Sequence, residues 1–253
     1  MKKQTLLRLI MLHKFINSGD LAIDIEFGNQ HGFFSGARDR VCDKETYCKK
    51  VINRSFDVDN CVAKGKIKEL IDIGSDSLVR ELDIHAIQDS FLFDFVSRFV
   101  VLSNNRNAYI SEMEIKHNNS NIYYQYPDDK PVKVPLGDKH WLEFFNEGSS
   151  IEKYFDNVFY IRDESQPDGR YKWIVHHRKI AKPEYSELIL RGCNPRIEGV
   201  IPYQKYLPRI IKNTLFRIRE KKYPNFPLMV VGVVNVKNDF LKIKTKLRLS
   251  EDA

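Results

Sequence analysis

The sequence predicts a mixed α/β fold, a central mixed sheet flanked by helices, because segments of both periodicities alternate along the chain. Residues 21–27 (LAIDIEF) alternate apolar and polar side chains, as a half-buried strand does. Residues 208–222 begin at a proline and repeat apolar residues at helical spacing. No linker, composition break or internal repeat divides the 253 residues, so we expect a single domain over 1–253.

The N-terminal segment begins the predicted order of elements. Two lysines precede a short apolar run, but Arg8 interrupts the run and no small-residue cleavage site follows. Apolar residues from Leu6 to Phe15 repeat at helical spacing, which predicts an amphipathic helix that ends at Ser18-Gly19-Asp20. No stretch approaches the roughly 18–20 apolar residues that cross a bilayer. We therefore expect a cytoplasmic protein without a membrane partner.

The remaining elements follow from the period of the apolar residues. Helical patterns are predicted at 60–73, 76–90, 140–145, 151–155 and 208–222. Strands are predicted at 21–27, 91–102, 108–117, 122–126, 158–162, 171–176, 228–236 and 241–249. The last of these (LKIKTKLRL) alternates apolar and basic residues, so one face of this strand packs and the other forms a cationic ladder.

Charge is distributed unevenly along the chain. Residues 170–253 contain 19 Lys and Arg against 7 Asp and Glu, whereas residues 1–169 contain 22 against 27. A surface that carries mainly positive charge attracts polyanions. The sequence therefore predicts that a basic part at 170–253 binds double-stranded DNA. The alternative is an ordinary solvated basic surface. The predicted nucleic-acid-binding residues are Arg170, Lys172, Arg178, Lys179, Arg209, Lys212, Arg217 and Lys221.

The segment 108–117 contains the most informative residues for chemistry. Period-two alternation places Glu114 and Lys116 on one face of a strand. A carboxylate can bind a divalent metal, and a neighbouring ammonium can offset charge that builds on a phosphate. Asp94 lies among phenylalanines in the preceding strand, where a carboxylate is costly unless something pairs with it. If strands 91–102 and 108–117 are antiparallel neighbours, Asp94 and Glu114 meet on one face. An exposed strand of alternating charge would show the same pattern.

These residues, in this order, resemble the PD-(D/E)xK nuclease core, most closely that of small type II restriction endonucleases. The resemblance spans Asp94, Arg98-Phe99 and Glu114-Ile115-Lys116-His117. It implies a restriction-endonuclease-like core, with Asp94 and Glu114 as ligands of Mg²⁺ or Mn²⁺ and Lys116 as catalytic lysine. Glu81 resembles an additional helical glutamate of some members, and the roles of Glu81 and His117 are left open. Whether this chain forms a homodimer is left open.

Other motifs match the patterns of known functional sites less well. Asp24 and Glu26 match the D-x-E of RNase H-like exonucleases, with a His85 and Asp89 pair that comes too early in the chain. Cys42, Cys48, Cys61 and Cys193 lack the spacing of a zinc site, and no phosphate-binding glycine loop is present. The sequence thus predicts a Mg²⁺-dependent deoxyribonuclease, with an acidic catalytic part at 1–169. The alternative is a non-catalytic nucleic-acid-binding protein.

Overall fold

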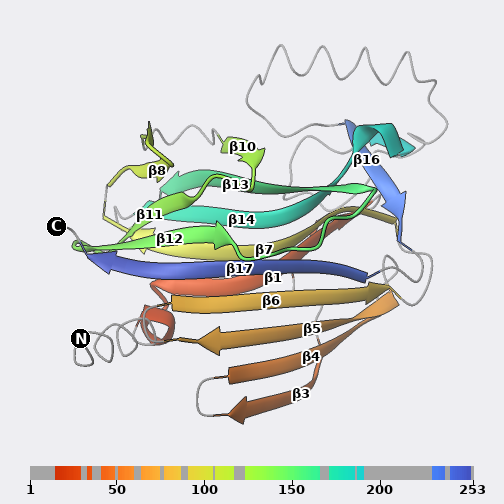
Figure 1. The fold of residues 1–253 in the computed structure, drawn as a ribbon, viewed down its shortest axis with the longest axis horizontal. Helices are drawn as coiled ribbons and strands as arrows, with labels where there is room; N and C mark the ends of the chain where they lie inside the picture. Colours follow the sequence, from red (N-terminus) through yellow and green to blue (C-terminus); the bar gives the residue numbers. More distant parts are fainter. Residues whose placement is uncertain are drawn as a thin grey trace.

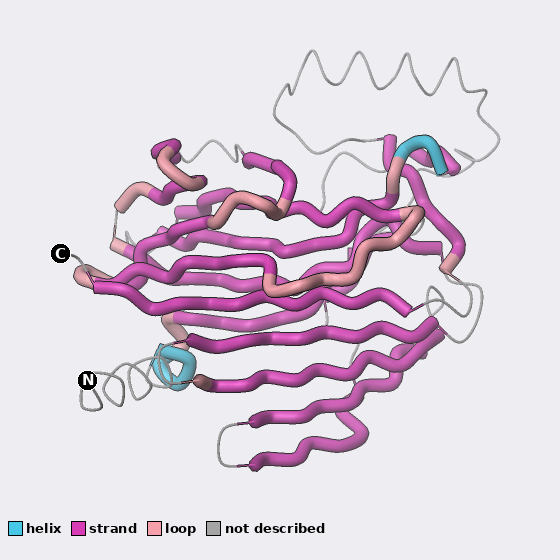
Figure 2. Tube along the Cα trace, in the orientation of Figure 1, coloured by secondary structure: helices cyan, strands magenta, loops and turns pink. Residues whose placement is uncertain are grey.

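The computed structural model shows two antiparallel β-sheets packed face to face (Figures 1 and 2). Within the described residues, helix is limited to residues 15–18 and the short 3-10 segment η1 (Pro183–Tyr185). None of these described helices is long and apolar enough to cross a membrane. The described residues are 15–29, 33–35, 41–48, 51–59, 64–74, 77–86, 91–104, 106–116, 123–165, 171–185, 187–190, 230–236 and 240–251.

The first sheet, sheet A, has β14 and β7 at its centre. Its strands run in the order β10 (Tyr123–Pro127), β13 (Phe155–Ser165), β14 (Tyr171–Ala181), β7 (Phe91–Ser103), β1 (Leu21–Asn29) and β2 (Phe33–Ser35). β16 (Val230–Asn235) also pairs with the start of β7 and with β15 (Glu187–Leu190).

The second sheet, sheet B, has the C-terminal strand near its middle (Figure 1). Its strands run in the order β3 (Val41–Cys48), β4 (Val51–Asp59), β5 (Lys64–Ile73), β6 (Ser77–Ala86), β17 (Phe240–Glu251), β12 (His140–Asn146), β11 (Val132–Leu136), β8 (Ala108–Ile110) and β9 (Met113–Ile115).

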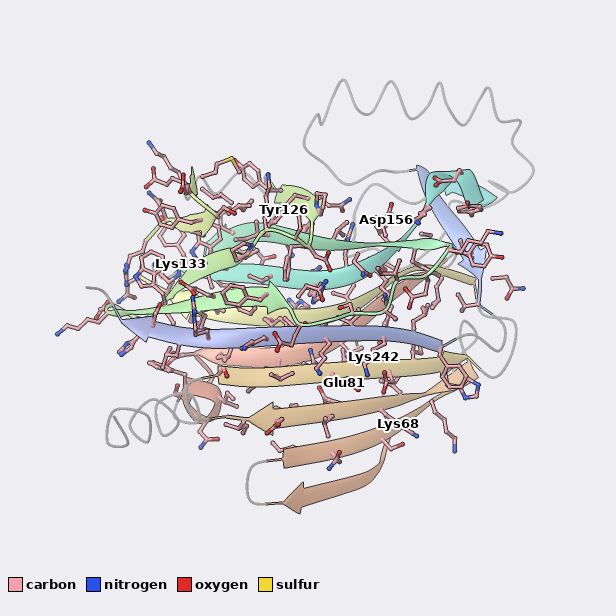
Figure 3. The ribbon with its side chains drawn as sticks, in the orientation of Figure 1. Lys68, Glu81, Tyr126, Lys133, Asp156 and Lys242 are labelled. Carbon is pink, nitrogen blue, oxygen red and sulfur yellow. The ribbon has the colours of Figure 1, made fainter. Side chains whose placement is uncertain are left out.

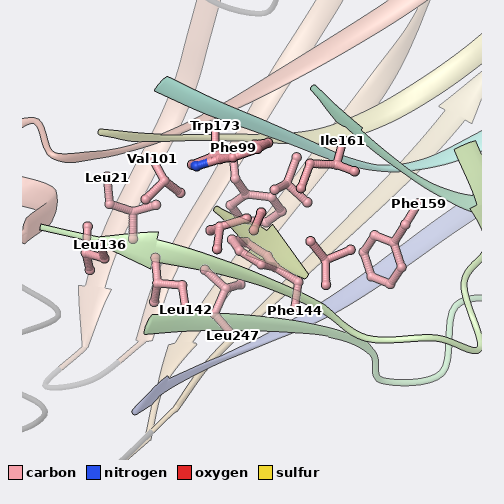
Figure 4. Packing of buried hydrophobic residues seen from close by; sticks show 14 of the residues in the cluster. Leu21, Phe99, Val101, Leu136, Leu142, Phe144, Phe159, Ile161, Trp173 and Leu247 are labelled. Carbon is pink, nitrogen blue, oxygen red and sulfur yellow. The ribbon is translucent and has the colours of Figure 1, made fainter. Parts of the chain in front are cut away.

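The core lies between the two sheets, where alternate residues of both interdigitate. Phe99 of β7 and Phe144 of β12 meet across it with ring centroids 5.1 Å apart. Figure 4 shows the same layer of side chains, in which Trp173, Phe159 and Val101 of sheet A lie near Leu142 and Leu247 of sheet B. Because each sheet buries its inner face on the other, sheet packing takes the place of the flanking helices that the sequence predicted.

The α/β fold prediction is wrong, and β5 and β6 show why. The segments 60–73 and 76–90, predicted as helices, contain strands whose inward residues alternate with outward ones. Two inward positions hold Glu69 and Arg80, which are 2% and 0% exposed. These charged residues interrupt the apolar alternation, and the remaining apolar residues then fit a helical period. Segment 140–145 is likewise the strand β12, and residues 151–154 precede β13 without forming a helix.

The predicted hairpin between 91–102 and 108–117 is also absent. β7 pairs with β1, β14 and β16 in sheet A. Residues 108–115 instead form two short strands of sheet B that reverse at Ser111 and Glu112. Ser111 has a φ of 51°, in the left-handed region, which fits a tight two-residue turn between antiparallel strands.

The strands predicted at 21–27, 91–102, 122–126, 158–162, 171–176, 228–236 and 241–249 are all present within slightly different bounds. β17 alternates as expected: Ile243 and Leu247 are buried, whereas Lys244 and Lys246 lie on the outer face. The predicted first helix is seen at residues 15–18, and it ends at Gly19, whose φ is 80°. The predicted helix 208–222 lies outside the described residues. The single domain and the cytoplasmic location stay predictions.

Candidate ligand-binding face

Strand β14 sends its side chains to opposite faces of sheet A. Trp173 and Val175 lie in the core between the sheets. The period of two therefore places His177 on the same inner face and His176 on the outer face, which points away from sheet B. Figure 1 shows β14 between β13 and β7. On each face of the sheet, the side chains of β14 therefore lie between side chains of these two strands.

His176 and Tyr160 form the centre of the outer face. The two residues lie opposite each other in the pairing of β13 with β14. Their rings are stacked, with centroids 4.9 Å apart and an angle of 24° between the planes. The Arg178 guanidinium carbon lies 5.2 Å from the centre of the Tyr160 ring, a cation–π contact. His176 is 9% exposed and Tyr160 is 7% exposed, so the packing of this centre fixes its geometry.

Arg178 connects this centre to two polar side chains from other strands. Its Nη1 lies 3.4 Å from Asp94 Oδ2 on β7. Its Nη2 donates a hydrogen bond to the side-chain oxygen of Gln125 on β10. Asp94 is 1% exposed, and a carboxylate so far from water requires charged or hydrogen-bonding partners. The guanidinium of Arg178 is one of them.

Further charged pairs lie on the same outer face. Arg98, directly opposite His176 on β7, has its Nη1 3.9 Å from Asp24 Oδ2 on β1. On β13, Arg162 Nη1 lies 2.6 Å from Glu164 Oε1, and Lys172 Nζ of β14 lies 3.0 Å from the other oxygen of Glu164. We call this set the outer site: Asp24, Asp94, Arg98, Gln125, Tyr160, Arg162, Glu164, Lys172, His176 and Arg178.

The outer site keeps His176 neutral. Burial lowers the pKa of the His176 imidazole well below its usual value, because the charged form loses its hydration. Arg98, Arg178 and Arg162 lower this pKa further through their positive charges. A neutral imidazole has one nitrogen that accepts a hydrogen bond and one that donates. At neutral pH the His176 imidazole therefore has one nitrogen that can accept a proton and one that carries a proton.

On the inner face, His177 joins the two sheets. Its Nδ1 lies 2.9 Å from Thr245 Oγ1 on β17, and its Nε2 lies 3.0 Å from Asp128 Oδ2. A carboxylate only accepts, so the imidazole proton is assigned to Nε2 and Nδ1 accepts from the threonine hydroxyl. This arrangement resembles a hydrolase triad, but Thr245 is fully buried in the core. We therefore assign it to the stability of the sandwich.

Lys179 occupies the next inward position and has a buried set of oxygen partners. Its Nζ donates to the carbonyl of Ser150 at 2.6 Å, to Asn157 Oδ1 at 2.8 Å and to the carboxylate of Glu152. Burial lowers the pKa of Lys179, and the Glu152 carboxylate opposes this shift. Lys179 thus anchors the 150–152 loop to the end of sheet A.

The structure separates the residues of the predicted nuclease site. Asp94 lies in sheet A and contacts Arg178, whereas Glu114 lies on β9 at the edge of sheet B. Glu114 is exposed and accepts a hydrogen bond from Asn107 at 2.9 Å. Lys116 follows β9 and is exposed, and His117 lies outside the described residues. The prediction of Mg²⁺ or Mn²⁺ depended on Asp94 and Glu114 as a pair of ligands, and these two residues lie in different sheets. Within the described ranges, no cluster of three or more His, Cys, Asp or Glu residues could hold a metal ion.

The three predicted DNA-binding cations that lie in the described residues, Lys172, Arg178 and Lys179, do not form one basic surface. Lys172 and Arg178 face outward beside carboxylates, whereas Lys179 is buried between the sheets. The cationic ladder of β17 is paired in the same way, since Lys242 Nζ lies 2.6 Å from Glu81 Oε1 on β6 (Figure 3). Five of the predicted contacts lie outside the described residues: Arg170, Arg209, Lys212, Arg217 and Lys221.

The other sequence hypotheses are also corrected. Glu81 lies on a strand and not on a helix, and its carboxylate contacts Lys242. Asp24 of the RNase H-like alternative lies in sheet A, whereas His85 lies in sheet B and stacks on Phe240. Asp89 lies outside the described residues.

Sequence reasoning named some residues of the outer site but not the site itself. Asp94 was singled out as a buried carboxylate in need of a partner, and Arg178 as a phosphate contact. Their contact joins residues 84 positions apart, a pairing that no local pattern reveals. The missed signal was on β13, where Tyr160, Arg162 and Glu164 repeat at a period of two and so share one face.

Comparison with known proteins adds little to this geometry. No family model matches the sequence, and no curated protein matches it. Among solved structures, a protein provisionally assigned as an aldose 1-epimerase from Escherichia coli K12 is similar at 7% identity and a TM-score of 0.47, over 84% of this chain and 69% of that one. A galactose mutarotase-related enzyme from Lactobacillus acidophilus is similar at 11% identity and a TM-score of 0.35, over 92% and 79%.

At such scores neither likeness assigns an activity to this chain. The β-sandwich is not a PD-(D/E)xK core, and Asp94 and Glu114 lie in different sheets. The predictions of a metal-dependent deoxyribonuclease and of double-stranded DNA as its partner are therefore wrong.

Proposed function

We propose that the outer site binds a small polyhydroxylated compound of the carbohydrate class and transfers protons on it through His176. The observation that carries this proposal is the stacked pair of His176 and Tyr160, surrounded on one face of sheet A by arginines that contact carboxylates. A ligand on this face meets an aromatic ring and charged groups of both signs.

A hydroxylated ligand suits this mixture of groups. Arginine and lysine only donate hydrogen bonds and an ionised carboxylate only accepts them, whereas a hydroxyl does both. A compound with several hydroxyls can thus pair with Arg98 and with Asp24 at the same time. Because carboxylates accompany the cations, the face lacks the single sign of charge that a polyanion requires.

The chemistry proposed for His176 follows from its protonation state. A neutral imidazole with a pKa below neutrality is a base at physiological pH, and its second nitrogen carries a proton to donate. Opening a sugar ring requires removal of the proton of the anomeric hydroxyl and protonation of the ring oxygen. Closing the ring on the other side exchanges the two anomers. Exchange between anomers is thus a reaction that this group can catalyse.

The test combines binding with anomer exchange. Saturable binding of hexoses and pentoses to the full chain is measured by saturation-transfer NMR, and the rate of anomer exchange is measured by exchange spectroscopy on the same samples. We expect at least one aldose to bind and its exchange to accelerate. His176→Gln should retain binding and lose the acceleration, because glutamine forms hydrogen bonds but does not titrate.

His177→Gln is the matched control, since the neighbouring histidine points to the opposite face. It should lower stability and leave exchange by the folded protein unchanged. If no aldose binds at millimolar concentration, the proposal is refuted. If His176→Gln keeps the full acceleration, the proton transfer does not belong to His176.

A further inference from the structure

We propose that Arg98, Arg162 and Arg178 bind an oxyanion, a carboxylate or a phosphate group, carried by the ligand of the outer site. This inference rests on the proposed function, because it names the chemical class of the same ligand. It separates acidic or phosphorylated sugars from neutral ones.

The strand register places the three arginines around one point. Arg98 lies directly opposite His176 on β7. Arg162 lies opposite Ile174 on β13 and is thus a diagonal neighbour of His176. Arg178 is two residues along β14 on the same face. Side chains in such directly opposite and diagonal positions reach one another across a sheet, above all when they are long.

Each arginine is also oriented by a carboxylate from another position. Asp24 contacts Arg98, Asp94 contacts Arg178 and Glu164 contacts Arg162. Arg178 also donates to Gln125. A guanidinium presents its N–H donors in a planar fork, a geometry that suits the oxygens of a carboxylate or a phosphate. Three oriented guanidinium groups match the several oxygens of a carboxylate or phosphate with charge-assisted hydrogen bonds.

The charges around His176 favour the same ligand. The positive charges of the three arginines all lower the pKa of the His176 imidazole, so the electrostatic potential at the centre of the site is positive. An anion placed among them reduces that potential, and the pKa of His176 should then rise. The carboxylates Asp24, Asp94 and Glu164 around the same site repel a polymer of phosphates. They thus disfavour a ligand that carries many anionic groups.

The experiment compares ligands that differ in one group. Glucose, glucuronate and glucose 6-phosphate are titrated into the full chain by calorimetry, at constant ionic strength. We expect glucuronate or glucose 6-phosphate to bind at least about tenfold more tightly than glucose, since one charge-assisted hydrogen bond corresponds to about that factor. Whichever of the two binds more tightly identifies the group as a carboxylate or a phosphate.

Two variants isolate the arginines. Arg98→Gln should reduce the preference for the anionic ligand, the ratio of its affinity to that of glucose, to near unity. Arg248→Gln removes the same charge from the outer face of sheet B, where Arg248 contacts Glu143, and should leave the preference unchanged. A loss of preference in both variants would mean that only net charge matters, and the inference would be overturned.

An independent readout separates this inference from the proposed function. The pKa of His176 is measured by NMR with and without inorganic phosphate. A rise that disappears in Arg98→Gln supports the oxyanion site even if no sugar binds, in which case only the proposed function fails. Equal affinities for glucose and both acidic ligands, with no phosphate-dependent rise, would overturn the inference and leave the proposed function standing.

Discussion

The buried ion pair between Glu69 and Arg80 should contribute strongly to stability. Arg80 Nη2 lies 2.6 Å from Glu69 Oε1, and their side chains are 0% and 1% exposed. The same guanidinium donates to the carbonyl of Asp24 at 2.8 Å and to Ser97 Oγ at 2.9 Å. It therefore joins β6 of sheet B to β1 and β7 of sheet A, behind the outer site.

The perturbation is Glu69→Gln, which keeps the shape of the side chain and removes its charge. Removing one partner of a buried pair leaves an uncompensated charge and costs about 3–5 kcal/mol. The bonds from Arg80 to Asp24 and Ser97 remain, so we expect the lower end, about 3 kcal/mol. The double variant Glu69→Leu/Arg80→Met, which buries no charge, should recover at least half of that loss.

Urea unfolding followed by tryptophan fluorescence measures these differences, because Trp173 is fully buried in the core. Glu143→Gln is the control, since Glu143 contacts Arg248, whose side chain is 52% exposed. An exposed pair contributes at most about 1 kcal/mol. If Glu69→Gln costs no more than this control, the charge of Arg80 is compensated elsewhere and the reasoning is refuted.

Two further predictions concern the histidines of β14. Burial lowers the pKa of both His176 and His177, so the unfolded chain binds more protons, and the free energy of unfolding should fall as the pH drops through about 6.5. Each histidine contributes up to about 1.4 kcal/mol per pH unit to this change. Urea titrations from pH 7.5 to 5 measure the free energy of unfolding, and its dependence on pH should be weaker in His177→Gln. An unchanged pH dependence in this variant would contradict the assignment to His177. Thr245→Val removes the hydroxyl that donates to His177 Nδ1 and should lower the free energy of unfolding by about 1–3 kcal/mol. Thr245→Ser keeps the hydroxyl and should lower it less. Equal losses of stability in the two variants would assign the effect to packing.

Local pattern predicted the strands whose inner faces are mainly apolar. β17 is the clearest case, because Leu241, Ile243, Leu247 and Leu249 alternate with basic residues and Thr245 is the one polar residue among these inward positions. β5 and β6 were missed because Glu69 and Arg80 occupy core positions, and such a pair is recognisable only when both partners are seen. The outer site was missed for the same reason, since the pairs Arg178–Asp94 and Arg98–Asp24 join residues that are distant in sequence.

The net charge of a segment predicts a surface field only when that segment packs on itself. Among the described residues, the sheet topology places the basic strands β14 and β17 between strands of the acidic part. β14 lies between β13 and β7, and β17 lies between β6 and β12, so all four neighbours come from residues 1–169. Each basic strand therefore places its cations beside carboxylates of acidic segments, as in the pairs Arg178–Asp94, Lys172–Glu164, Lys242–Glu81 and Arg248–Glu143. For these two strands, charges that are segregated along the sequence become paired in the fold, and the cations of β14 contribute to a site of mixed charge.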